Sequence, residues 1–203
     1  MWDKIVELDQ QLFLALNGDL GAGADRFFYA VSSNWMWVPL CLAILYMMYR
    51  RFGLRTTLTA FAFAVVAIVL SAQICNLFKY SIQKYRPAHH ADLQGMVHYV
   101  EGYVGGLYGT FSAHAATYCC LAVFTARLFK KPVYTFLIAL WVILVCYSRI
   151  YLGMQFPGDL LLGGITGFLV GWGALNHFRS PRSPTYYTPD TFNYATLGSS
   201  ENA

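Results

Sequence analysis

Cationic and polar side chains recur in short segments that together could hold a phosphate group. Lys79 and Arg86 stand seven residues apart, about two helical turns, so both are expected on one side of a helix that ends before Pro87. Ser112 can cap the next helix, whose free N–H groups would bind an anion beside His114. Taken singly, such cations are typical of contacts with lipid headgroups, and such a histidine is typical of a structural residue.

A third segment, SRIYLGMQFPGD, adds a cation, an amide and a carboxylate. Arg149 is expected to end one helix, Pro157 suits the first turn of the next, and Asp159 follows within that turn. Asp159 alone would be explained as a favourable charge at a helix N-terminus. Gln155 stands where a residue able to attack phosphorus is wanted. The three segments together suit the binding of a phosphate dianion and the protonation of a leaving alcohol.

The composition predicts that membrane helices position these residues. The chain has 203 residues, 57% of them hydrophobic and 12% charged, where a soluble domain carries about a quarter charged residues. Asp, Glu, Lys and Arg are absent from five runs, residues 27–49, 56–78, 102–126, 132–148 and 160–178. About 20 apolar residues span the hydrocarbon core, so five transmembrane helices are predicted. A soluble protein with five buried helices would show polar helix faces, which these runs lack.

The remaining segments complete the predicted organisation. Residues 1–17 mix apolar and charged side chains at helical spacing, which predicts an amphipathic helix lying in the membrane interface. We therefore expect an all-α integral membrane bundle, with one domain over residues 1–179. The polar, proline-containing segment 180–203 is predicted to be a flexible tail.

Basic residues between the predicted spans set the orientation. Five crossings place eight of them on one face, which the positive-inside rule makes cytoplasmic: Arg50, Arg51, Arg55, Arg127, Lys130, Lys131, Arg179 and Arg182. The same crossing parity brings the three polar segments together at the opposite face. Chance placement would scatter them over both faces.

Other residue patterns exclude several kinds of site. The five cysteines lie within predicted spans and show no CxxC spacing, so neither a metal site nor a disulfide framework is predicted. A net charge of +4 gives no evidence for nucleic-acid binding. His89, His90 and His98 lack the ligand spacing of a metal site, and the loop 88–110 that holds them is predicted to shape the entrance to the phosphate site.

The three segments resemble the signature of the phosphatidic acid phosphatase type 2 superfamily, KxxxxxxRP, PSGH and SRxxxxxHxxxD. KYSIQKYRP matches the first motif in full. FSAH departs from the second at Phe111 and Ala113, both mild changes because a small residue still leaves the backbone reachable. SRIYLGMQFPGD departs from the third at Gln155, which replaces the histidine of the family.

The resemblance implies a role for each matching residue. Phosphate would be bound by Lys79, Arg86, Ser112, Arg149 and the backbone N–H of Ala113. His114 would be the general acid, and position 155 would hold a nucleophilic histidine, oriented by Asp159, that forms a phosphohistidine. No metal or cofactor is implied. The nitrogen lone pair of the Gln155 amide is delocalised into the carbonyl, so this chain should bind phosphate and turn it over very slowly.

The expected natural reaction is hydrolysis of a phosphate monoester or pyrophosphate on a lipid, at the periplasmic boundary of a bacterial inner membrane. Undecaprenyl pyrophosphate, phosphatidate or phosphatidylglycerol phosphate, and lipid A phosphates are all candidate substrates. Membrane lipids are the expected partners, and the oligomeric state is left open. Gln155 is explained either as an inactivating change in an enzyme or as the native residue of a lipid-phosphate-binding pseudoenzyme. A small lipid transporter is the third alternative, although it would need polar residues along a path between helices, and the spans offer mainly Gln73 and Asn76 near one end.

Overall fold

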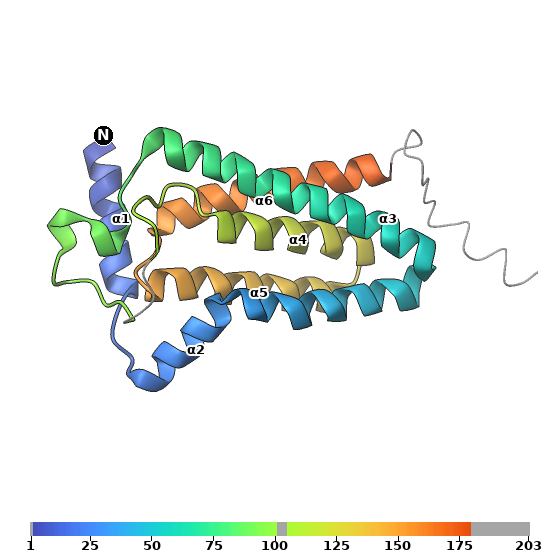
Figure 1. The fold of residues 1–203 in the computed structure, drawn as a ribbon, viewed down its shortest axis with the longest axis horizontal. Coiled ribbons are helices and arrows are strands. Elements are labelled where there is room, and N and C mark those ends of the chain that lie inside the picture. Colours follow the sequence, from blue (N-terminus) through green and yellow to red (C-terminus); the bar gives the residue numbers. More distant parts are fainter. Residues whose placement is uncertain (1, 101–104, 180–203) are drawn as a thin grey trace, which may run out of the picture.

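The chain folds into a helical bundle, described by a computed structural model for residues 2–100 and 105–179 (Figure 1). All regular elements within these ranges are helices, which confirms the predicted all-α class. The α-helices are α1 (Trp2–Leu16), α2 (Ala22–Ser32), α3 (Trp37–Ile82), α4 (Ala113–Phe129), α5 (Pro132–Tyr151) and α6 (Pro157–Phe178). Short 3-10 turns cover Asn34–Met36, Pro87–His89 and Ala91–Leu93. The predicted tail, residues 180–203, lies outside the described residues.

Helix α3 contains two arms that run in opposite directions (Figure 1). The chain turns at Gly53, whose φ of 75° and ψ of 171° lie in a region that is essentially confined to glycine. The Thr57 hydroxyl donates a hydrogen bond of 2.8 Å to the Gly53 carbonyl and supports the start of the second arm. With α4, α5 and α6, the described part of the chain thus has five arms packed in one bundle, as the five apolar runs predict.

Within the described ranges, three helices are long and apolar enough to cross a membrane: α3, α5 and α6. Helix α4 is apolar but shorter, with 17 residues. The predicted first run, 27–49, is divided in the structure, because α2 ends at Ser32 and α3 begins at Trp37. Ser33 causes this break: its hydroxyl donates to the Ala30 carbonyl at 2.6 Å, and its backbone becomes extended.

Helix α4 packs against α3, α5 and α6, and its contact with α6 is the most extensive. Gly163, Gly167 and Gly171 of α6 face the α4 backbone at Ser112, Ala116 and Cys120, and a Cβ atom at any of the three glycines would overlap it. The fully buried Phe124 belongs to a core cluster with residues of α3, α5 and α6. Close α4–α6 packing therefore fixes the start of α4 relative to the start of α6.

Helix α1 lies across the end of the bundle at which α4 and α6 begin (Figure 1). Its Phe13 is fully buried, and its ring meets the ring of Phe156 edge-on, with centroids 5.4 Å apart. Ile5, Leu8 and Leu12 form an exposed apolar stripe on the same helix. One face of α1 thus packs on the bundle, and another is apolar and free for lipid, as expected of an interfacial helix.

Candidate phosphate site

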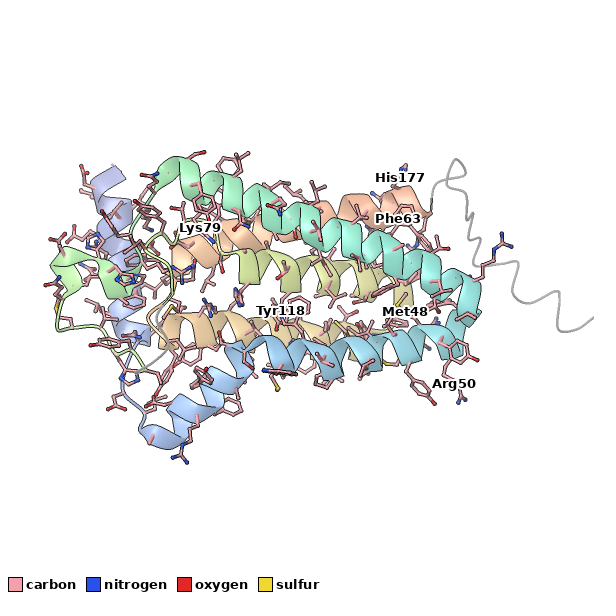
Figure 2. All side chains as sticks on the ribbon, viewed as in Figure 1. Met48, Arg50, Phe63, Lys79, Tyr118 and His177 are labelled. Carbon is pink, nitrogen blue, oxygen red and sulfur yellow. The ribbon has the colours of Figure 1, made fainter. Side chains whose placement is uncertain are left out.

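Lys79 lies in the last turn of α3, at the α1 end of the bundle (Figure 2). Its Nζ is 3.3 Å from Asn76 Oδ1. The expectation that Arg86 shares this helix is wrong, because α3 ends at Ile82. Gln83 adopts the left-handed conformation, with φ 53°, and its N–H closes the helix on the Lys79 carbonyl at 3.0 Å. Arg86 therefore reaches the site from an extended segment.

Arg86 is clamped by the returning loop that leads to α4. Its Nε donates to the Tyr108 carbonyl at 2.9 Å, and its Nη1 is 3.3 Å from Met154 Sδ. A Cβ atom at Gly105 or Gly109 would collide with the Arg86 side chain. Glycine at these two positions thus allows the loop to enclose the guanidinium beside the residue that precedes Gln155.

Ser112 caps α4 as predicted, and it also joins α4 to α6. Its Oγ accepts the Ala115 N–H at 3.3 Å, and its own N–H donates to the Asp159 carbonyl at 2.9 Å. Ala113 and His114 follow in the first turn, where the free N–H groups and the helix dipole favour an anion. The expected helix start is therefore present, and a hydrogen bond to α6 holds its cap, while anion binding there stays a prediction.

His114 is half-buried and lies within electrostatic reach of three cations, Arg149, Lys79 and Arg86. Lys79 in turn interacts electrostatically with Arg86, Arg149 and Asp159. These residues come from the end of α3, the following loop, the start of α4, the end of α5 and the start of α6. The structure thus brings the predicted phosphate-binding residues together at one end of the bundle.

Arg149 and Gln155 flank the segment that joins α5 to α6. Arg149 is 4% exposed and donates from Nη1 to Ser32 Oγ at 2.5 Å. Gln155 is 3% exposed, and among the described residues no hydrogen-bond partner reaches its Oε1. An unmet buried acceptor costs about 1–3 kcal/mol, so fold stability does not explain a glutamine here.

Both carboxylate oxygens of Asp159 accept hydrogen bonds from groups other than Gln155. Oδ2 accepts the Phe156 N–H at 3.3 Å, and Oδ1 accepts from Lys84 Nζ at 3.2 Å. Asp159 is only 2% exposed, so this lysine supplies the positive charge that a buried carboxylate requires. The expected role of Asp159 in orienting a histidine at position 155 stays a prediction.

Lys84 is the residue that sequence reasoning missed. Its Nζ also contacts Asp9 Oδ2 of α1 at 3.3 Å and lies 4.3 Å from the centre of the Phe156 ring. The sequence signal that could have placed Lys84 in the site is its position inside KYSIQKYRP, between Lys79 and Arg86.

A different set of side chains has the composition of a metal site. Ligand atoms of Asp19, Asp25 and His98 lie within 4.8 Å of one another. Protein groups already engage all three. Asp19 Oδ1 accepts the Gly21 N–H at 2.7 Å, and His98 Nε2 is 3.0 Å from Asp25 Oδ1, which also accepts from the Tyr151 hydroxyl at 2.6 Å. The Tyr151 hydrogen bond holds the pKa of Asp25 below its ordinary value. These contacts account for the cluster as a hydrogen-bonded brace between α2, the loop and α5.

The assembled site can hold a phosphate dianion and protonate an oxygen, because it combines three cations, a helix N-terminus and an imidazole. It holds no nucleophile at position 155, since an amide nitrogen does not form a phosphoramidate bond in the way an imidazole does.

Comparison with known proteins identifies the family. The profile of the PAP2 superfamily matches residues 60–182. A lipid A 4'-phosphatase of Porphyromonas gingivalis is 40% identical over 174 residues, which cover 83% of this chain and 72% of that protein. A lipid A 4'-phosphatase of Bacteroides thetaiotaomicron is 33% identical over 174 residues, covering 85% of this chain and 77% of that protein.

Two solved structures share the fold. The crystal structure of Aquifex aeolicus LpxE superposes with a TM-score of 0.66 at 22% identity, covering 83% of this chain and 95% of that one. A transmembrane PAP2-type phosphatidylglycerolphosphate phosphatase from Bacillus subtilis gives a TM-score of 0.65 at 17% identity, covering 85% of each chain. From the profile match over more than half of its length and from these relatives, the chain belongs to the PAP2 superfamily.

Proposed function

We propose that this membrane lipid phosphatase is built to remove the 4'-phosphate of lipid A. The observation that carries the proposal is the convergence of Lys79, Arg86, Arg149 and the α4 N-terminus around His114, at the membrane boundary marked by α1. The choice of lipid A as substrate rests on the two relatives, which are both lipid A 4'-phosphatases. We place the site on the periplasmic side of a bacterial inner membrane, because the basic residues between the spans lie at the opposite end of the bundle.

The chemistry follows from the positions of the side chains. The cations and the Ser112 end of α4 neutralise the phosphate oxygens, and their charge stabilises the developing transition state. A nucleophilic imidazole at position 155 would form a P–N bond while the P–O bond to the sugar breaks. His114 would donate its proton to the departing oxygen and would then take a proton from the water that cleaves the P–N bond. Inorganic phosphate and the free enzyme would result.

Gln155 stops this sequence at its first step. The chain as written should therefore bind a lipid phosphate and release phosphate very slowly. We infer that it is an inactivated form of an enzyme, because the chain retains His114 and, within electrostatic reach of it, Lys79, Arg86 and Arg149. A native lipid-phosphate-binding protein is the second candidate, favoured by the ion pair between Asp159 and Lys84, which leaves Asp159 engaged without a histidine.

The test is phosphate release by the detergent-purified Gln155→His variant and by the unmodified chain. The substrate panel contains lipid A, phosphatidate, phosphatidylglycerol phosphate and undecaprenyl pyrophosphate. We expect the variant to release the 4'-phosphate of lipid A fastest and to trap an acid-labile phosphohistidine. Inactivity of a folded variant on the whole panel would favour the binding protein, and equal activity of the unmodified chain would mean that the nucleophile is another residue.

A further inference from the structure

The interfacial helix α1 reaches the candidate site through a chain of charges. Asp9 Oδ2 contacts Lys84 Nζ at 3.3 Å, and the same ammonium contacts Asp159 Oδ1 at 3.2 Å. The other oxygen of Asp9 accepts the Gly158 N–H at 2.7 Å, in the first turn of α6. One carboxylate of α1 thus holds both Lys84 and the start of the helix that carries Asp159.

The same residues are fixed by apolar packing. Phe13, one turn after Asp9 on α1, is fully buried against Phe156 and Leu160. The Lys84 ammonium lies over the Phe156 ring, an arrangement that is favourable for a cation. Because Gln155 immediately precedes Phe156, these contacts determine where position 155 lies.

The chain of contacts continues to the anion-binding end of α4. Asp159 accepts the Ser112 N–H on its backbone carbonyl at 2.9 Å, so a shift of Asp159 shifts the cap of α4. Lys84 is 30% exposed by side chain, Asp9 16% and Asp159 2%. The Asp159 carboxylate is therefore largely desolvated while Lys84 keeps some contact with solvent, and loss of the lysine leaves a buried carboxylate without its countercharge.

We propose that Lys84 and Asp9 are positioning residues of the phosphate site, with α1 supplying the carboxylate that holds Lys84 and the start of α6 in place. Lys84 acts through Asp159 and Ser112, while Lys79, Arg86 and Arg149 bind the phosphate. The proposal rests on the proposed function, because it takes the α4 N-terminus and these three cations as the phosphate site. Its consequence is that the packing of α1 on the bundle and the positions of the phosphate-binding residues are coupled.

Orthovanadate binding to the unmodified full-length chain tests the proposal without any need for turnover. Titration calorimetry in detergent would compare the parent with Lys84→Gln, Lys84→Arg, Asp9→Ala and Glu7→Ala. Glu7 is the matched control, because it carries the same charge on α1 but is exposed and contacts Gln11 of its own helix. Thermal unfolding of each variant sets a titration temperature at which all of them are folded.

We expect Lys84→Gln and Asp9→Ala to weaken vanadate binding by about tenfold, the lower end of what outer partners of ligating groups contribute in metal sites. Lys84→Arg and Glu7→Ala should retain most of the affinity. The direction of the change in vanadate affinity of Asp9→Ala is decisive. Removal of a negative charge near an anion site strengthens binding if only Coulomb forces act, whereas loss of positioning weakens binding.

Unchanged or tighter vanadate binding by Asp9→Ala would overturn the positioning role and leave the proposed function standing. A failure of Lys84→Arg to restore what Lys84→Gln loses would also overturn it. If the parent chain binds no vanadate, the phosphate site itself is wrong, and the inference falls with the proposed function. Where Asp9→Ala is too unstable to titrate, Asp9→Asn removes the charge with little change in shape. The same direction of change in vanadate affinity then decides.

Discussion

In the proposed mechanism, the residue at position 155 decides whether the site can react. A glutamine there keeps a side chain of similar reach and polarity to neutral histidine and lacks a nucleophilic nitrogen. Its buried Oε1 has no hydrogen-bond partner among the described residues, so the described protein groups leave this acceptor without a donor. A protonated phosphate oxygen or a water would meet this need, which is consistent with a site that binds but does not react.

The role of His114 gives a second prediction at this scale. In the Gln155→His background, His114→Ala should lower the turnover of lipid A by about a hundredfold to ten thousandfold, the usual contribution of a general acid. The turnover of an aryl phosphate with a good leaving group should fall far less, because its departing oxygen needs no proton. The ratio of the two rates checks the assignment, and an equal loss on both substrates would contradict it.

Metal independence also belongs to the residue scale. The phosphate charge is expected to be met by Lys79, Arg86 and Arg149, so EDTA treatment of the Gln155→His variant should leave phosphate release unchanged. Asp19→Ala, which removes one member of the cluster formed by Asp19, Asp25 and His98, should likewise leave phosphate release unchanged. Loss of activity with the chelator, restored by a divalent cation, would refute the mechanism.

At the scale of elements, the closeness of α4 and α6 determines the geometry of the site. Gly167 meets the Ala116 backbone without room for a Cβ, whereas Gly164, three residues earlier on the same helix, has open space at that position. Gly167→Ala should therefore lower the free energy of unfolding by about 1–3 kcal/mol through overpacking. Gly164→Ala should be neutral or stabilising, by up to about 1 kcal/mol, through helix propensity.

Thermal or denaturant unfolding in detergent, read by circular dichroism, compares these two variants. Vanadate affinity of Gly167→Ala should fall as well, since the α4 cap is held at Ser112 by Asp159 of α6. Equal stability of the two variants would show that the helices separate without cost, and close packing would then not explain the glycines.

Local signals predicted several elements correctly, and contacts distant in sequence account for most of what they missed. Ser112 and Pro157 start their helices as their residue types predict, because capping and ring geometry act within one turn. The left-handed end of α3 at Gln83 carries no such signal, since glycine usually occupies this position. The bond between Lys84 and Asp159 joins residues 75 positions apart, and no local pattern records it.

At the scale of the whole molecule, the two ends of the bundle carry different sets of basic residues. Figure 2 places Lys79 at the α1 end and Arg50 and His177 at the other. There, Arg127 stacks on the Trp172 ring, with 3.3 Å from Cζ to the centroid, and its backbone carbonyl accepts a hydrogen bond from Arg179. The crossing parity of the sequence thus accounts for the position of the site, although it leaves the direction of insertion to be measured.

Impermeant maleimide labelling measures that direction. Met96→Cys lies in the loop beside the site and Lys131→Cys between α4 and α5, and both parent side chains are exposed. We expect Met96→Cys to react in intact bacterial cells with a permeable outer membrane, and Lys131→Cys to react only after lysis. The unmodified chain is the control for its own five cysteines. The reverse pattern would place the site in the cytoplasm.

The turn at Gly53 has a consequence for how the protein is made. A single residue reverses the chain, so no loop separates the two arms of α3, and Ile44 and Met48 of the first arm share one core cluster with Ala60 and Ala64 of the second. Such a helical hairpin is suited to enter the bilayer as one unit, and the positive-inside rule predicts that Arg50, Arg51 and Arg55 stay on the cytoplasmic side. A side chain at residue 53 would strain the turn, and newly made chains would then be expected to fail at insertion before the site has formed.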